Sequence, residues 1–147
     1  VYDGVKLVSF DQVISSSDIL SLHVPLTEET NHLISYKELE KMKENTILIN
    51  VSRGGLINEK ALSEYLKSGK VRGVGLDVME DHNPSSTNPL FEYENVIVTP
   101  HTAFFSQESS EELQIRSCEQ LYGALNGKKP KFLINHDVLD HPDVNLI

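Results

Sequence analysis

Ionisable side chains follow four apolar runs of this 147-residue chain. His23 follows residues 19–22, Arg53 follows 47–49, Asp77 follows 71–76 and His101 follows 95–99. An arginine can hold a carboxylate with its planar fork of N–H donors, and a histidine can pass a proton near neutral pH. Together these groups suit proton transfer at a carbonyl or hydroxyl beside a carboxylate, as in oxidation of a 2-hydroxy acid with a hydride acceptor.

The apolar runs that carry these side chains indicate the strands of a parallel sheet. They are short and almost continuously apolar, and helical patterns separate them at residues 10–16, 36–42 and 59–68. A longer helical pattern follows Ser106, and residues 5–8 are predicted to form a further short strand. We therefore predict an α/β fold, a doubly wound parallel sheet with helices on both faces.

Local signals set the predicted ends of the helices. Ser35 and Glu38 have the spacing of a capping box, and Asn58 and Ser106 are suited to cap the helices that follow them. Gly69 is suited to end the helix that Asn58 begins. Asn126 and Gly127 are expected to end the last long helix, whose apolar stripe includes Leu113, Cys118, Leu121, Tyr122 and Leu125. The tail after residue 128 is expected to pack in part through Phe132, Leu133 and Ile134.

Parallel strands gather the candidate side chains at one edge of the predicted sheet. In open sheets of this kind, ligands bind outside the carboxyl ends of the strands. Each residue alone has an ordinary alternative: a structural histidine for His23, a loop anchor for Asp77, and a solvated arginine beside a turn for Arg53. Glycines 54 and 55 are expected to let the backbone turn tightly and a ligand approach. Four such side chains at one edge indicate a functional site.

Composition narrows the classes of partner. The formal net charge is -9 and no basic patch stands out, which argues against nucleic-acid binding. No apolar run approaches the length of a membrane span, and the N-terminal residues lack a signal-peptide pattern. The single cysteine, Cys118, favours a reducing cytoplasmic setting and is expected to be a small core residue. His23, Asp77 and His101 lack metal-ligand spacing, so no metal site is predicted.

The motifs at the strand ends resemble a known family. The segments SDILSLHVPLT at 17–27, INVSRGGLI at 49–57, GLDV at 75–78 and TPH at 99–101 are similar to signatures of the D-isomer-specific 2-hydroxyacid dehydrogenases. The resemblance extends over residues 5–135. It implies a Rossmann-type domain that binds NAD.

The resemblance also implies roles for individual residues. Arg53 would hold the substrate carboxylate and 2-oxo group, His101 would be the general acid and base, and Asp77 would bind the nicotinamide carboxamide. The residues implied to line the NAD site are His23, Val24, Pro25, Thr30, Val51, Ser52, Arg53, Asp77, His101 and Ala103.

The chain departs from the family pattern in two ways. His82 stands where the family has a carboxylate, mostly Glu, that pairs with the catalytic histidine. A second imidazole cannot supply that negative charge, and Glu80 and Asp81 have unsuitable spacing. The Gly-x-Gly-x-x-Gly loop is also missing, since Gly73-x-Gly75 lies inside a predicted strand. We therefore expect a partial Rossmann-type sheet without the first βαβ unit.

These observations predict the C-terminal part of a longer enzyme. Residues 1–127 would be a portion of the NAD-binding domain, and residues 128–147 a tail that returns to the substrate domain. The expected activity is NAD-dependent oxidation of a small D-2-hydroxy acid to a 2-oxo acid, and the resemblance implies that the protein forms a homodimer. Two alternatives remain: a non-enzymatic NAD-binding regulatory or interaction protein on the same scaffold, and an inactive truncated remnant. Neither the particular acid nor the choice of NAD over NADP is indicated.

Overall fold

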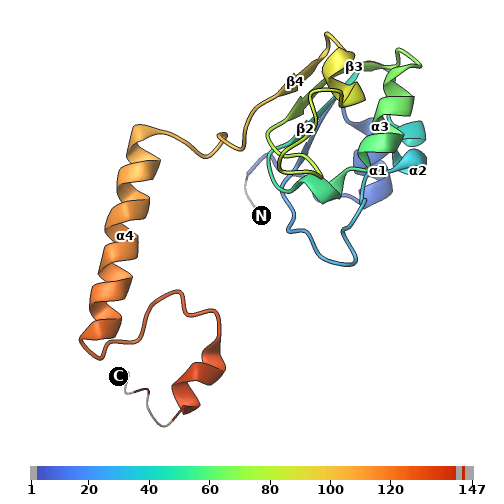
Figure 1. Cartoon of the computed structure of the whole chain (residues 1–147). Helices are drawn as coiled ribbons and strands as arrows, with labels where there is room; N and C mark the ends of the chain where they lie inside the picture. Colours follow the sequence, from blue (N-terminus) through green and yellow to red (C-terminus); the bar gives the residue numbers. More distant parts are fainter. Residues whose placement is uncertain (1–2, 142–143, 145–147) are drawn as a thin grey trace. The chain divides into compact units, whose positions relative to one another are not determined.

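The computed structural model describes residues 3–141 and residue 144. The chain divides into two compact units, Val1–Ala103 and Phe104–Ile147. Figure 1 shows that the first unit is built from a sheet with helices beside it, and that a long helix dominates the second. The candidate strand-end residues all belong to the first unit.

The sheet of the first unit is parallel throughout, as predicted. Its strands are β1 (Ile19–Leu22), β2 (Thr46–Asn50), β3 (Val71–Leu76) and β4 (Val96–Val98), in the order β1-β2-β3-β4. The register places the last residues of the four strands, Leu22, Asn50, Leu76 and Val98, side by side. The four strand ends are therefore level along one edge of the sheet.

One face of the sheet packs against a layer of short helices (Figure 1). These are α1 (Phe10–Ser16), α2 (Tyr36–Lys41) and α3 (Glu59–Leu66), and the connections include the 3-10 turns η1 (Gly54–Leu56) and η2 (Pro89–Glu92). The helices contribute buried side chains such as Ile14, Leu39 and Leu62, which form one core with Leu20, Leu48 and Val74 of the strands. Alternate strand residues supply that core because neighbouring side chains point to opposite faces.

The opposite face of the sheet is much less covered. Ile19 and Ile97, which alternate with the core residues, are 62% and 69% exposed. The strand order β1-β2-β3-β4 always advances in the same direction across the sheet. Because the connections between parallel strands are right-handed, they then all lie on the same face and leave the other face uncovered. The predicted α/β fold is confirmed, whereas the expected helical layers on both faces are not found within the described residues of the first unit.

The predicted caps are present. The Asn58 side chain accepts a hydrogen bond from the Ala61 amide at 2.9 Å, and the Glu38 carboxylate accepts one from the Ser35 amide at 3.3 Å. Gly69 ends the α3 region with a φ of 70°, which is a conformation that glycine adopts without steric cost. Short-range signals thus set the starts of α2 and α3, which follow the loops at the ends of β1 and β2.

The predicted strand at residues 5–8 is wrong. These residues are exposed and have no regular secondary structure. A strand requires a partner for its backbone hydrogen bonds, and in the described part of the chain β1 pairs with β2 alone. Apolar composition therefore did not suffice to form a strand.

The second unit contains α4 (Gln107–Leu125) and the 3-10 turn η3 (His136–Asp140). Ser106 caps α4 as predicted by accepting a hydrogen bond from the Ser109 amide at 3.0 Å, and Gly127 follows its end with a φ of 76°. The helix buries none of its residues, so the prediction that Cys118 lies in a core is wrong. In the tail, Phe132 and Ile134 are exposed and Leu133 is half-buried, so only Leu133 shows the expected packing. An apolar stripe indicates a face that can pack, but it does not supply a partner within the same unit.

No helix in the described part of the chain, α4 included, has the length and apolarity needed to cross a membrane.

Candidate functional site

The level strand ends bring the predicted residues to one edge of the sheet. His23 directly follows β1, Arg53 follows β2, Asp77 directly follows β3 and His101 follows β4. Because the strands are parallel and in register, all four residues lie at the edge where open parallel sheets bind ligands. The predicted clustering of strand ends is confirmed.

Asn50, the last residue of β2, organises the segment that carries Arg53. It is fully buried, and its side-chain amide donates to the Arg53 carbonyl at 2.8 Å. Its side-chain oxygen accepts from the Ser52 amide at 3.1 Å, and its carbonyl accepts from the Asp77 amide at 2.9 Å. A buried side-chain amide that satisfies backbone groups in this way fixes the turn after β2 and ties it to β3.

Ser52 connects this turn to the loop after β1. Its hydroxyl donates to the Val24 carbonyl at 2.6 Å. Arg53 itself is exposed, and its Nη1 donates to the Ser52 carbonyl at 2.7 Å. A guanidinium has five N–H donors, so this bond leaves donors that can pair with a carboxylate.

The loop after β1 is held by its own side chains. The Thr30 hydroxyl donates to the Pro25 carbonyl at 2.7 Å and accepts from the Thr27 amide at 2.7 Å. The His23 ring nitrogen Nε2 lies 2.8 Å from the Ser21 hydroxyl. Thr30 and His23 therefore shape this loop in addition to any contact with a ligand.

Gly54 is required by a close approach of two backbones. A Cβ atom at this position would lie 1.9 Å from the Met79 carbonyl oxygen, which is far inside van der Waals contact. The sequence had indicated that Gly54 and Gly55 allow a ligand to approach. The structure shows that Gly54 also lets the turn after β2 pack on the loop after β3, which brings the Arg53 and Asp77 segments together.

The Asp77 carboxylate anchors the loop that carries His101. Asp77 is only 4% exposed. Its Oδ1 accepts from the Thr99 hydroxyl at 2.5 Å and from the Thr102 amide at 2.8 Å, and its Oδ2 accepts from the Ala103 amide at 2.9 Å. Burial of the carboxyl opposes ionisation, but the hydrogen bonds from Thr99, Ala103 and Thr102 outweigh it and hold the pKa of Asp77 below its ordinary value.

His101 has a left-handed backbone conformation, with a φ of 55°. A residue other than glycine held in this region costs about 1–3 kcal/mol. Hydrogen bonds to a charged group contribute about 1.5–3 kcal/mol each, so the two amide bonds to the Asp77 carboxylate are large enough to offset that cost. The His101 amide also donates to the Asp77 carbonyl at 2.9 Å.

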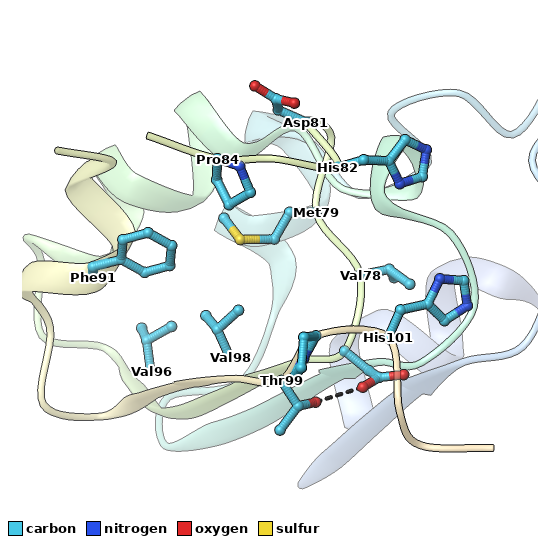
Figure 2. Close-up of a pocket in the computed structure, with 12 residues that line it drawn as sticks. Val78, Met79, Asp81, His82, Pro84, Phe91, Val96, Val98, Thr99 and His101 are labelled. Atoms are coloured by element: carbon cyan, nitrogen blue, oxygen red, sulfur yellow. Dashed lines mark hydrogen bonds between the residues drawn. The ribbon is translucent and has the colours of Figure 1, made fainter. Parts of the chain in front are cut away.

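A pocket of about 510 Å³ opens beside this loop. Figure 2 shows the His82 and His101 imidazoles at the end of the pocket opposite Phe91. The apolar part of the pocket is formed by Met79, Pro84, Phe91, Val96 and Val98. His82, at the position where a carboxylate was expected, therefore lines the same pocket as His101.

The two carboxylates next to His82, those of Glu80 and Asp81, make hydrogen bonds of their own. Glu80 lies 3.1 Å from His32 Nε2 and accepts from the Glu59 amide at 2.9 Å, and its own amide donates to Glu59 at 2.6 Å. Burial raises the pKa of Glu59. The Asp81 side chain accepts from the Asn83 amide at 2.9 Å. Asp81 also lines the pocket, but Figure 2 shows its carboxylate directed away from both imidazoles. These observations support the expectation that neither Glu80 nor Asp81 replaces the missing carboxylate.

Sequence reasoning missed three parts of this site. Thr99 and Thr102 were not identified as partners of Asp77, and the Glu59–Glu80 clamp was not predicted. A polar residue immediately after an apolar strand, as Thr99 is after β4, was the available signal. The clamp joins residues 21 positions apart in the sequence and had no local signal.

Comparisons with known proteins agree with this geometry. Residues 2–103 match the model of the family described as D-isomer specific 2-hydroxyacid dehydrogenase, NAD binding domain. A glyoxylate reductase from Korarchaeum cryptofilum is 40% identical over 136 residues, which are 92% of this chain and 41% of that protein. A D-3-phosphoglycerate dehydrogenase from Archaeoglobus fulgidus is 39% identical over 95% of this chain and 27% of its own length.

A solved structure is similar as well. The D-lactate dehydrogenase from Lactobacillus jensenii, determined with NAD+, superposes with a TM-score of 0.81 at 32% identity. The match covers 88% of this chain and 43% of that chain. In all three comparisons this chain spans less than half of the protein that it matches.

Proposed function

The chain belongs to the D-isomer specific 2-hydroxyacid dehydrogenase family, and we propose that it forms part of an enzyme that interconverts a small D-2-hydroxy acid and its 2-oxo acid. NAD is the cofactor of the matched domain, and when bound it would supply the hydride acceptor or donor. One observation carries the proposal: Arg53, Asp77 and His101 stand at the ends of three adjacent parallel strands.

Each of these residues has a chemical task in the proposed reaction. The Arg53 guanidinium would bind the substrate carboxylate and orient the 2-oxo group. The His101 imidazole would take a proton from the 2-hydroxyl during oxidation and return it to the carbonyl oxygen during reduction. Both side chains are exposed at the strand edge, so a substrate can reach them.

The strand edge also fits the nicotinamide end of NAD. A carboxylate offers about four acceptor positions. The described contacts of Asp77 use two on Oδ1 and one on Oδ2, which leaves an acceptor for a carboxamide N–H. We assign the remaining wall of this site to His23, Val24, Pro25, Thr30, Val51, Ser52 and Ala103. The 147 residues contain no Gly-x-Gly-x-x-Gly motif, so no group here is assigned to the pyrophosphate.

The proposal includes the organisation of the protein. Residues 1–127 would belong to the NAD-binding domain and residues 128–147 to a tail that returns to the substrate domain. The enzyme would be a homodimer located in the cytoplasm. The single cysteine supports the reducing compartment but not the oligomeric state.

The proposed activity is tested by measuring NADH oxidation by the native protein that carries this chain, with glyoxylate, hydroxypyruvate and pyruvate as substrates. His101→Gln should lower kcat by about 10²- to 10⁴-fold, the usual contribution of a general acid or base. Binding of NADH, followed by its fluorescence, should persist in this variant. Wild-type kcat in His101→Gln would remove this histidine from the mechanism.

His82 gives specific support to a second candidate, a non-enzymatic NAD-binding regulatory protein on the same scaffold. The imidazole lines the pocket beside His101 and cannot act as the carboxylate partner of the family. Such a protein would bind NADH without turning over any of the three 2-oxo acids.

Replacing His82 separates the two candidates. In an enzyme limited by the missing carboxylate, His82→Glu should raise kcat and move the acidic limb of the oxidation pH profile to higher pH. The added charge would favour the protonated imidazole and hold it in one tautomer. If neither kcat nor the pH profile changes, His82 does not act on His101.

A further inference from the structure

The loop from Thr99 to Ala103 converges on a single acidic residue. The amides of His101, Thr102 and Ala103 all donate to Asp77: the first to its carbonyl, the second to Oδ1 and the third to Oδ2. Turns whose successive N–H groups converge form binding sites for anions. Here the anion is a side chain of the protein itself.

Thr99 connects this anion to the loop from the other side. Its amide donates to the Leu76 carbonyl at 2.9 Å, which extends the β3–β4 ladder by one residue. Its hydroxyl donates to Asp77 Oδ1 at 2.5 Å, the bond drawn as a dashed line in Figure 2. Thr99 is thus fixed to the sheet through its backbone, and its side chain can fix the rotamer of Asp77.

We propose that Thr99 is a positioning residue, which orients the Asp77 carboxylate so that it holds His101 in its left-handed conformation. Without the hydroxyl, Oδ1 of Asp77 loses one of the two donors that hold it, and its hydrogen bond from the Thr102 amide is weakened, while Oδ2 keeps its bond from the Ala103 amide. The loop would then relax toward a commoner backbone conformation, and the His101 imidazole would change direction. This inference rests on the proposed function, because it assigns His101 the proton transfer.

The inference also widens the role of Asp77. Its carboxylate anchors the loop with three acceptor positions and offers a further one to the cofactor. Thr99 contacts Asp77 through Oδ1, whereas the remaining acceptor lies on Oδ2. A change at Thr99 should therefore affect the direction of His101 more than the binding of NADH.

A matched pair of variants tests this role in the native protein. Thr99→Val keeps the shape of the side chain but removes the hydroxyl, and Thr99→Ser keeps the hydroxyl but removes the methyl group. Thr99→Val should lower kcat by about 10- to 100-fold, as expected when a reacting group is misplaced. Its Kd for NADH should change by less than about threefold, and Thr99→Ser should recover at least half of the wild-type kcat.

Amide hydrogen exchange at Thr102 and Ala103 provides a readout that does not depend on turnover. The Thr102 amide should exchange faster in Thr99→Val than in Thr99→Ser, because its acceptor Oδ1 has lost one of its two donors, and the Ala103 amide should change less. If Thr99→Val fails to fold, Thr99→Ala is the substitute for the same comparison with Thr99→Ser.

The outcomes distinguish this inference from the proposed function. Unchanged kcat together with unchanged exchange in Thr99→Val would overturn the positioning role. Absence of turnover in the wild-type protein would overturn the proposed function, and the exchange rates alone would then decide whether Thr99 holds the loop. An equal fall in kcat for Thr99→Ser and Thr99→Val would show that packing of the methyl group, and not the hydroxyl, is what matters.

Discussion

The helices of the two units are stabilised in different ways. In the first unit, α1, α2 and α3 have only seven, six and eight residues, and each buries at least one side chain. In the second unit, α4 has 19 residues and buries none. Helices α2 and α3 of the first unit and α4 of the second begin at capping residues that the sequence identifies.

This difference shows that a helix can be stabilised either by packing against a core or by its own length. Isolated helices shorter than about 12–15 residues are marginal in water, so α1–α3 depend on the core that they share with the sheet. Helix α4 is longer than that limit and has a capped start and a glycine after its end. Truncation of a buried side chain should therefore be costly in the first unit, whereas truncation of an α4 side chain, none of which is buried, should be nearly neutral.

The largest expected difference concerns one leucine in each helix. Leu62 of α3 is 0% exposed and Leu121 of α4 is 63% exposed. Leu62→Ala should lower the free energy of unfolding of the first unit by about 2–5 kcal/mol. Leu121→Ala should change stability by no more than about 0.5 kcal/mol. Urea unfolding combined with amide exchange in α3 and α4 measures both, and equal losses would show that α4 is packed in solution.

Two glycines extend the comparison. Gly54→Ala places a Cβ 1.9 Å from the Met79 carbonyl oxygen, and the resulting shift should cost about 1–3 kcal/mol. Gly123→Ala in α4 places its Cβ 3.7 Å from Lys128, an ordinary contact, and should stabilise the helix by about 0.5–1 kcal/mol. Thermal unfolding followed by circular dichroism records the two opposite signs. A stable Gly54→Ala protein would mean that the turn after β2 can separate from the loop after β3.

The smallest expected difference between the two units is in how the stability of each depends on pH. Burial of Asp77 would raise its pKa, but its hydrogen bonds outweigh burial and lower the pKa. The pKa of Glu108, at the start of α4, is lowered by hydrogen bonds from the Glu108 backbone amide and from the Ser106 hydroxyl. A carboxyl with a lowered folded-state pKa stabilises the fold above its unfolded pKa of about 4, and this contribution is lost as the pH falls through the folded value.

Because Asp77 is buried and Glu108 is exposed, only the first carboxyl should affect stability measurably. Asp77→Asn should reduce the difference in unfolding free energy between about pH 7 and pH 3, and Glu108→Gln should leave that difference almost unchanged. A loss of acid sensitivity in Glu108→Gln equal to that in Asp77→Asn would contradict this assignment.

The sequence predicted the elements whose causes are local. The caps were identified because their hydrogen bonds join groups only three residues apart: the side chains of Asn58 and Ser106 accept from amides, and the Glu38 side chain accepts from the Ser35 amide. The strand-end placement of Arg53, Asp77 and His101 followed from apolar runs that alternate with helices. These features depend on patterns that a short segment contains in full.

The parts that sequence reasoning missed depend on distant partners. Residues 5–8 have a strand composition but no neighbouring strand in the described part of the chain. Cys118 lies in an apolar stripe, yet α4 buries none of its residues. The close approach of the Met79 carbonyl to Gly54, 25 residues away, had no signal near Gly54 in the sequence. Apolar character and glycine content show what a segment can do, but a second segment determines which option is realised.

The order of the strands has a consequence for how this fold is made. Each strand pairs with the next one in the sequence, so every new strand meets an edge that earlier residues have already formed. During synthesis on the ribosome, the sheet can therefore grow one strand at a time without waiting for a distant segment. The last strand to be added, β4, leads directly into the Thr99–Ala103 loop, so the turn that carries His101 can close only after the Asp77 carboxylate is in place.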